Sequence, residues 1–229
     1  MTDPSAPSTP EQLRWAEALA GIARTGLAFT QNQYERERFD EVLRVAADIR
    51  ASALEESSAE ALYDLWAGDI GRGVEGYVTP KSAVGAVVGN DDGEILLGKR
   101  ADSGEWYYPV GWADVGYSPS EVAVKEVLEE TGIECEPVRL IAVFDVMRQG
   151  FAGIPLYSIV FHCRAVGGTL RPHPLETQGV GFFAREALPT PLRYAPRWVD
   201  LAFDAIDGKD APCWFDAPRA PMWRTPPEA

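Results

Sequence analysis

Three glutamates stand close together in the sequence, at positions 126, 129 and 130. Because these positions are three and four residues apart, a helix would place the carboxylates of Glu126, Glu129 and Glu130 on one face, within one turn. Carboxylates held this close repel one another unless a cation lies between them. Hard dications such as Mg²⁺ and Mn²⁺ prefer oxygen ligands of this kind. The spacing therefore predicts a metal site suited to phosphate chemistry, although acid-rich helix faces are also common as plain solvated surface.

The residues around these glutamates predict the helix that would carry them. Ser118, Pro119 and Glu121 have the pattern of a capping box with proline at the first helical position. The apolar residues that follow recur at helical spacing, and Gly132 is well placed to end the helix. We therefore expect a capped helix with the acidic side chains on its outer face.

The span from Gly111 to Ile133 resembles the sequence box of the Nudix hydrolase family. That box is a glycine, five residues, a glutamate, seven residues, Arg-Glu, an aliphatic residue, any residue, Glu-Glu, any residue, a glycine and an aliphatic residue. The positions in register are Gly111, Glu126, Val127, Glu129, Glu130, Gly132 and Ile133. Two positions differ, because the first box glutamate is Tyr117 here and the arginine is Lys125.

The resemblance implies an α/β protein with the Nudix α/β/α sandwich and mixed sheet, which hydrolyses phosphoric anhydride bonds with Mg²⁺ or Mn²⁺ as cofactor. Glu126, Glu129 and Glu130 would bind the metal and take part in catalysis. Lys125 would act in place of the arginine that orients these carboxylates. We place Gly111 with the metal-binding residues, because a residue without a Cβ lets the backbone come close to the site.

The two departures from the box both bear on the metal. Lys125 keeps a positive charge but loses the planar, bidentate fork of arginine, and Tyr117 removes one negative charge. We therefore expect weaker metal binding with the reaction retained. The alternative is a non-catalytic or weakly active Nudix module that senses a nucleotide-like ligand, and a third reading makes the acidic helix ordinary surface. The intact glutamates favour the enzyme.

The N-terminal part carries a second, less specific resemblance. Residues 15–27 and 34–39 look like the helical domain of one Nudix subgroup, and residues 111–116 look like the opening of its box. That subgroup hydrolyses nucleoside diphosphates linked to another group, X, with ADP-ribose and CDP-choline as typical substrates, and its members tend to be homodimers. The resemblance therefore implies a pyrophosphohydrolase that releases a nucleoside monophosphate and phospho-X, and it implies a homodimer.

Three residues outside the glutamate helix are candidates for binding the substrate. Arg100 ends a predicted strand and has the fork that suits phosphate oxygens, or else it is an exposed strand-end cation. Glu176 precedes another predicted strand and would supply an extra ligand or base in the Nudix fashion, or else it is a loop carboxylate. Trp112 belongs to a group of aromatic residues near the box, any of which stacks on a base or packs in the core.

The remaining pattern predicts the elements around the site. Apolar residues at helical spacing predict a small helical N-terminal domain over residues 11–72, after a segment, 1–10, that we expect to be disordered. Glycines between 68 and 76 mark a flexible junction before a Nudix domain at 77–207, and a proline-rich tail follows at 208–229. In the Nudix domain we expect strands at 82–88, 94–98, 138–146, 156–163 and 179–183 and a helix at 197–206.

The overall composition excludes several functions. The net charge of −14 argues against nucleic acid as a partner and favours a small nucleotide derivative whose charge a metal can neutralise. With neither an apolar run of membrane-spanning length nor a secretory signal, we expect no membrane partner and a cytoplasmic protein. The three scattered cysteines, Cys135, Cys163 and Cys213, indicate buried thiols and no disulfide framework or zinc site.

Overall fold

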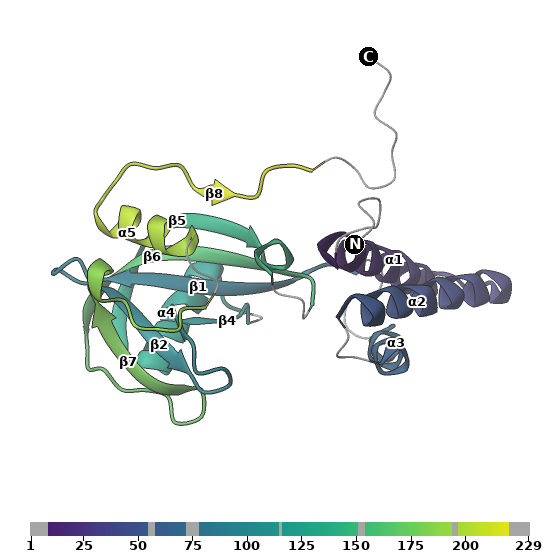
Figure 1. Ribbon diagram of the computed structural model, residues 1–229, viewed down its shortest axis with the longest axis horizontal. Coiled ribbons are helices and arrows are strands. Elements are labelled where there is room, and N and C mark those ends of the chain that lie inside the picture. Colours follow the sequence, from purple (N-terminus) through teal and green to yellow (C-terminus); the bar gives the residue numbers. More distant parts are fainter. Residues whose placement is uncertain are drawn as a thin grey trace, which may run out of the picture. The chain divides into compact units, whose positions relative to one another are not determined.

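The computed structural model describes residues 9–54, 58–71, 78–114, 116–150, 154–193 and 197–219 (Figure 1). The chain divides into two compact units, one formed mainly by residues up to Pro80 and the other by Lys81–Gln149 and Leu156–Ala217. Of the junction expected at residues 68–76, residues 72–76 lie outside the described residues. No helix in the described part of the chain is both long and apolar enough to cross a membrane.

The first unit consists of the helices α1 (Thr9–Phe29), α2 (Gln33–Leu54) and α3 (Ala59–Gly68). Small residues let these helices approach closely, because most of the buried positions on α1 and two of the four on α2 are alanines. Gly26 shows how close the approach is, since a Cβ there would lie 2.5 Å from ring atoms of Phe39. Leu43 and Trp66 complete the core. The helical domain expected from the sequence is therefore present, with a core of its own.

Two details of the helical unit add to the sequence prediction. Helix α1 begins at Thr9, so the last two residues of the segment expected to be disordered are helical, and residues 1–8 lie outside the described residues. Arg50 is almost fully buried and forms an ion pair with Glu17 of the neighbouring helix. A buried guanidinium requires such a partner, because an unpaired buried charge is strongly destabilising.

The second unit contains a mixed sheet with helices on its faces. Its strands and helices are β1 (Lys81–Gly89), β2 (Ile95–Arg100), β3 (Trp106–Tyr107), β4 (Val110–Trp112), α4 (Pro119–Thr131), β5 (Ile133–Asp145), β6 (Leu156–Gly168), β7 (Thr177–Phe183), α5 (Arg197–Ile206) and β8 (Trp214–Phe215). Strand β1 runs parallel to β6 and antiparallel to β4, while β5 and β6 form a long antiparallel pair. The sheet order is β3-β2-β1-β6-β5-β8, with β4 on β1 and β7 on β2.

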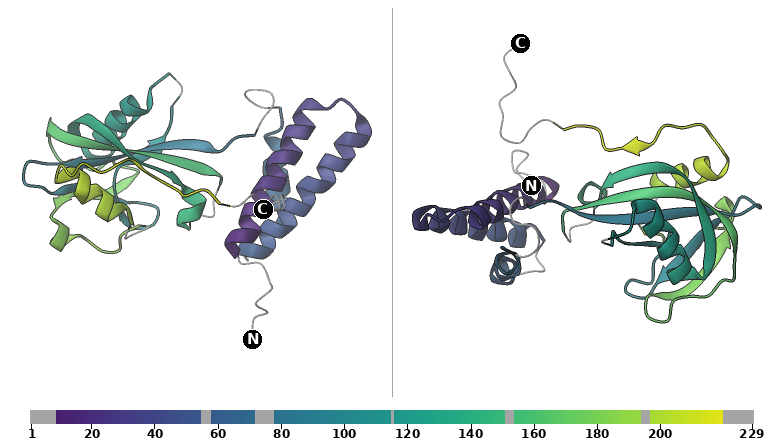
Figure 2. Two further views of the ribbon diagram at one scale, coloured as in Figure 1. Left: turned by 90° about the horizontal axis from the view of Figure 1, so that it is seen from above. Right: turned by 180° about the vertical axis from the view of Figure 1, so that it is seen from behind.

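Strand β1 is buried on both faces, which explains its continuous apolar sequence. Val84 and Val88 point to the face covered by α4, where they pack with Val127. Val87 points to the opposite face, where it packs with Trp198 and Phe203 of α5. The two helices thus cover opposite faces of the sheet, as Figures 1 and 2 show. This confirms the predicted Nudix α/β/α architecture.

The structure also corrects several expected elements. Strand β5 begins at Ile133, five residues before the expected start, because charged residues and Pro137 interrupt its apolar pattern and its pairing with β6 contains register shifts. The short strands β3 and β4 were not among the strands expected from the sequence. In the tail, β8 pairs in parallel with β5, and Trp214 packs on Phe144 at 4.9 Å between ring centroids. Cys135 and Cys163 are buried as expected, whereas Cys213 is partly exposed.

Candidate active site

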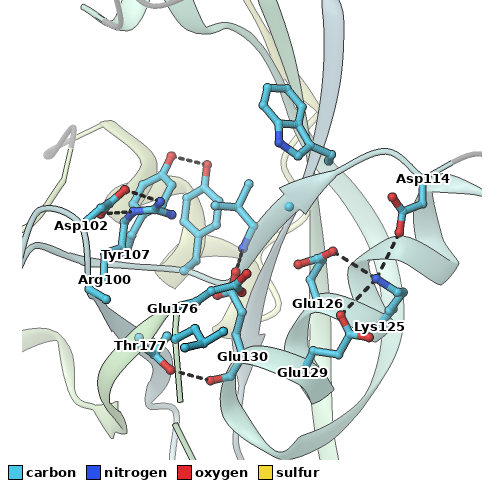
Figure 3. Close-up of a pocket in the computed structure, with 17 residues that line it drawn as sticks. Arg100, Asp102, Tyr107, Asp114, Lys125, Glu126, Glu129, Glu130, Glu176 and Thr177 are labelled. Atoms are coloured by element: carbon cyan, nitrogen blue, oxygen red, sulfur yellow. Dashed lines mark hydrogen bonds and ion pairs between the residues drawn. The ribbon is translucent and has the colours of Figure 1, made fainter. Parts of the chain in front are cut away.

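A cavity of about 450 Å³ lies at the acidic face of α4 (Figure 3). Its walls come from the end of β2, the β3–β4 segment, α4 and the start of β7. The volume lies in the range of small-molecule sites. Every candidate site residue from the sequence lines this one cavity: Arg100, Gly111, Trp112, Lys125, Glu126, Glu129, Glu130 and Glu176.

Helix α4 presents its acidic face to the cavity because both of its ends are fixed. At the start, the Ser118 hydroxyl accepts a hydrogen bond from the Glu121 amide, and the Glu121 carboxylate accepts one from the Ser118 amide at 2.6 Å. At the end, Gly132 takes the left-handed conformation with φ 73°. Val122 and Val127 bury the opposite face. The predicted capping box and helix end are thus both confirmed, and they set the direction of the glutamates.

Glu126 occupies space that Gly111 leaves open. A Cβ built on Gly111 would lie 2.2 Å from the Glu126 carboxyl carbon and closer than 2.5 Å to both of its oxygens. Any larger residue at position 111 would therefore push this carboxylate away. The glycine is required here for close approach between a strand and a helix side chain, as the sequence predicted.

Glu130 is the most deeply buried carboxylate of the site. Its Oε1 accepts a hydrogen bond of 3.4 Å from the Val110 amide. Burial, with the nearby Glu126 carboxylate as the next contribution, raises the pKa of Glu130 to about 8. Burial also raises the pKa of Glu126, although the Lys125 ammonium opposes this shift. The positive charge near Glu126 and Glu130 is therefore too small to offset the cost of ionising both carboxylates.

The Lys125 ammonium lies among three carboxylates at the edge of the cavity. Its Nζ is 3.0 Å from Glu129, 3.1 Å from Asp114 and 3.7 Å from Glu126. Hydrogen bonds to Glu129 and Asp114 raise the lysine pKa, so the side chain stays charged. Lys125 therefore contacts two of the three box glutamates, and it adds Asp114, to which the sequence assigned no role.

Arg100 lies across the cavity and is held by a neighbour. Its Nε and Nη2 donate hydrogen bonds of 2.9 and 2.7 Å to the two oxygens of Asp102. This bidentate contact lowers the pKa of Asp102 to about 2. The Coulomb fields of Glu130 and Glu176 also act on the guanidinium and help to raise its pKa. Arg100 is therefore an oriented cation facing the carboxylates, and a phosphate that used the same fork would have to replace Asp102.

The segment that carries Glu176 is attached to the end of α4. The amides of Arg171 and His173 donate to the carbonyls of Thr131 and Glu130 at 2.8 and 3.2 Å. These bonds satisfy carbonyl groups that the end of a helix otherwise leaves unpaired. The Thr177 hydroxyl also donates to the Glu130 carbonyl at 3.1 Å. Glu176, itself mostly exposed, is thereby brought to the mouth of the cavity.

The aromatic residues near the box divide into two groups. Tyr107 and Tyr108 stack at 3.9 Å, their hydroxyls are 2.6 Å apart, and the rings pack on Trp198. Tyr108 is fully buried and also fills the space above Gly85. Trp112 is different, because 53% of it is exposed. The two tyrosines thus serve in packing, and Trp112 offers an accessible ring at the cavity.

The residues fit a hard dication by their chemistry and by the space around them. Three carboxylates share one helix face, and Gly111 leaves room for the nearest of them. The raised pKa values of Glu126 and Glu130 indicate a deficit of positive charge that a dication would remove. Within the described residues, no three acidic, histidine or cysteine side chains already converge as a ligand set. Binding therefore requires the carboxylates to turn toward a shared ion.

Several residues at the cavity were missed by reasoning from the sequence. Asp102 and Thr177 act on Arg100 and Glu130 through hydrogen bonds that depend on how distant segments meet. Leu175 is highly exposed at the rim, next to Glu176. Of these residues, only Asp102 could have been predicted from the sequence, because an acidic residue two positions after an arginine at a strand end lies within reach of the guanidinium.

Comparison with known proteins gives consistent matches over both units. Residues 79–201 match the family described as NUDIX domain, and residues 10–66 match the family described as UDP-X-like, N-terminal oligomerisation domain. A protein of Bacillus subtilis (strain 168), provisionally named ADP-ribose pyrophosphatase YjhB, is 34% identical over 212 residues. The match covers 90% of this chain and 98% of that protein.

Two solved structures resemble the fold with appreciable sequence identity. A UDP-X diphosphatase aligns with a TM-score of 0.56 and 26% identity, over 92% of this chain and 100% of the other. An ADP-ribose pyrophosphatase of Streptococcus suis aligns with a TM-score of 0.54 and 32% identity, over 60% of this chain and 100% of the other.

Proposed function

Because the chain belongs to the Nudix hydrolase family, we propose that it is a metal-dependent pyrophosphohydrolase of nucleoside diphosphates linked to a second group, X. The products are a nucleoside monophosphate and phospho-X. ADP-ribose, CDP-choline and nucleotide sugars are the candidate substrates. The names of the relatives support this class, since two refer to ADP-ribose and one to UDP-X.

The obstacle to this reaction is negative charge, because an anionic diphosphate repels a hydroxide-like nucleophile. We assign Glu126, Glu129 and Glu130 as the residues that hold Mg²⁺ or Mn²⁺, with Gly111 providing the space. When bound, the metal neutralises phosphate oxygens and lowers the pKa of a bound water. Lys125 orients Glu126 and Glu129 through the contacts described above.

The opposite side of the cavity supplies the groups that would bind the substrate. Arg100 attracts the diphosphate and exchanges its contact with Asp102 for phosphate oxygens. Trp112 offers its exposed ring to a base, where such stacking contributes about 1–3 kcal/mol. Glu176 lies at the mouth, where it serves as an additional metal ligand or as a base.

One observation carries the proposal: the box carboxylates, an oriented arginine and an exposed tryptophan line the same 450 Å³ cavity. The test is a panel of ADP-ribose, CDP-choline, nucleotide sugars, dinucleoside polyphosphates and nucleoside triphosphates with Mg²⁺ or Mn²⁺. Release of nucleoside monophosphate is followed, with Glu130→Gln as the control. Metal-dependent cleavage that the variant lacks supports the enzyme. Binding of these compounds without cleavage supports the sensor alternative instead.

We also propose that the helical unit, residues 11–72, forms a homodimer. The matched family description names an oligomerisation domain. Helix α1 carries Trp15, Ile22 and Phe29, which are seven residues apart, and all three are exposed. Positions at this spacing lie along one side of a helix, as in a coiled-coil seam. This outer stripe is distinct from the α1 positions that form the unit's own core, and it is the surface we assign to the second copy.

A further inference from the structure

Asp114 is a carboxylate of the cavity to which the proposed reaction assigns no role. It lies between β4 and α4, and its Oδ2 is 3.1 Å from the Lys125 Nζ (Figure 3). The same ammonium contacts Glu129 at 3.0 Å and Glu126 at 3.7 Å. Lys125 therefore has two partners on its own helix and one outside it.

The partner outside the helix is attached to the sheet. The amide of Ala113 donates to the Ser82 carbonyl of β1 at 3.0 Å, and the carbonyl of Asp114 accepts from the Tyr117 amide at 3.3 Å. The loop that carries Asp114 is thus fixed at its start by a hydrogen bond to β1 and at Asp114 by a hydrogen bond from Tyr117. A lysine needs such an anchor more than an arginine does, because its ammonium is a point charge on a flexible stem.

Position 117 does not supply this anchor. Tyr117 brings no negative charge, its side chain is exposed, and it is not among the residues that line the cavity. Asp114 is the carboxylate of this loop that reaches Lys125. Without Asp114, the ammonium would keep only the contacts with Glu126 and Glu129, and it would compete with a dication for both.

We propose that Asp114 is a positioning residue, which draws the Lys125 ammonium toward the loop and so leaves Glu126 and Glu129 available to the metal. The inference rests on the proposed function, because it concerns the metal of the same site. It predicts that Asp114 acts on metal affinity and turnover, with little effect on substrate affinity.

The test measures Mn²⁺ binding by electron paramagnetic resonance of the free ion, together with kcat and KM for ADP-ribose, or for the best substrate of the panel. We expect Asp114→Asn to weaken Mn²⁺ binding about tenfold, as loss of an outer partner of a metal ligand does, and to lower kcat with KM within about twofold. Asp114→Glu, which retains the charge, should recover most of the affinity. Asp92→Asn makes the same charge change in the exposed β1–β2 turn and should match the wild type.

A second variant tests whether Asp114 acts through Lys125. In a Lys125→Met background, Asp114→Asn should cause no further loss of Mn²⁺ affinity, because the cation to be positioned is gone. Wild-type Mn²⁺ affinity in Asp114→Asn, or an equal loss with and without Lys125, would overturn the inference. Because Mn²⁺ binding is measured without substrate, a protein that binds the ion normally but cleaves nothing would contradict the proposed function alone. A wild type that binds no Mn²⁺ would contradict both.

Discussion

Helices α2 and α4 both carry several acidic residues, but the surroundings of these carboxylates differ between the two helices. On α2, Asp40 pairs with Arg44 at 3.0 Å and Glu41 pairs with Arg38 at 2.8 Å, and all four side chains are accessible to solvent. Pairs of this kind contribute about 0–1 kcal/mol. On α4, Glu130 is buried and its pKa is raised to about 8. Its neighbours Glu126 and Glu129 both contact the same cation, Lys125.

The difference lies in burial, since both helices have acids at helical spacing in the sequence. The acidic side chains on α2 keep most of their hydration, so ion pairs with nearby arginines are sufficient to balance their charge. On α4, Glu126 and Glu130 lose hydration at the wall of a cavity, and the positive charges of Lys125 and Arg100 do not offset this loss. Buried charge that is not balanced within the fold indicates a site for a charged ligand. The first two experiments below change matched residues of the two units.

The largest effect is expected for the deepest carboxylate. Glu130→Gln should lower kcat/KM by about three orders of magnitude, because a catalytic metal contributes several kcal/mol and each 1.36 kcal/mol is tenfold in rate. The variant should not lower the melting temperature of the metal-free protein, since it removes a carboxyl group whose ionisation is opposed by burial. Glu41→Gln on α2 should keep kcat/KM within about twofold. Equal losses in the two variants, measured by steady-state kinetics, would remove the distinction between the helices.

A glycine in each unit gives the next comparison. Gly111→Ala places a methyl group 2.2 Å from the Glu126 carboxyl carbon, so Glu126 must move. We expect a loss of about 100-fold in kcat/KM and a lower melting temperature, because such overpacking costs about 1–3 kcal/mol. Gly21→Ala in α1 meets no atom within 4 Å and should raise the free energy of unfolding by about 0.5–1 kcal/mol. Full activity of Gly111→Ala would show that the reaction does not require Glu126 in its observed position.

The outer stripe of α1 tests the helical unit. Ile22→Asp should weaken the homodimer about 30-fold or more, because burying an unpaired carboxylate costs at least about 2 kcal/mol. Analytical ultracentrifugation measures the dissociation constant. Val45→Asp changes an equally exposed apolar residue on α2 and should leave the dimer intact. If Val45→Asp dissociated the dimer and Ile22→Asp did not, the interface would lie on α2 and not on α1.

The smallest effect is expected at Tyr117, one of the two positions where the box departs from its pattern. Tyr117→Glu adds a negative charge on an exposed side chain of the loop before α4, where solvent screens it. We expect Mn²⁺ affinity to rise by about threefold, in isothermal titration calorimetry, with a matching rise in rate at low metal concentration. Unchanged affinity and unchanged rate would refute the idea that this substitution weakens metal binding.

The sequence predicted the parts of this protein that local chemistry controls. The capping box of Ser118 and Glu121 and the terminal Gly132 defined α4, and the helix at 197–206 was found with its observed bounds. Strand β5 was placed late because its first residues alternate with acids and a proline, and pairing with β6 overrides that weak local signal.

The candidate site divides in the same way. Lys125 and the three box glutamates share one helix, so their spacing was enough to bring them together. Contacts such as Asp102 with Arg100, or Thr177 with the Glu130 carbonyl, depend on where loops and distant strands meet. The burial that raises the pKa of Glu130 is also a property of the packed structure, and charge patterning in a sequence does not contain it.

The most direct test of a dication held by α4 is an anomalous difference map from crystals soaked in Mn²⁺. We predict a peak in the cavity within about 2.0–2.4 Å of carboxylate oxygens from Glu126 and Glu130, a usual range for hard cations. In Glu130→Gln crystals the same soak should give a weaker peak or none. A wild-type map without a peak beside these glutamates, in crystals of protein that hydrolyses its substrate only with Mn²⁺, would contradict it.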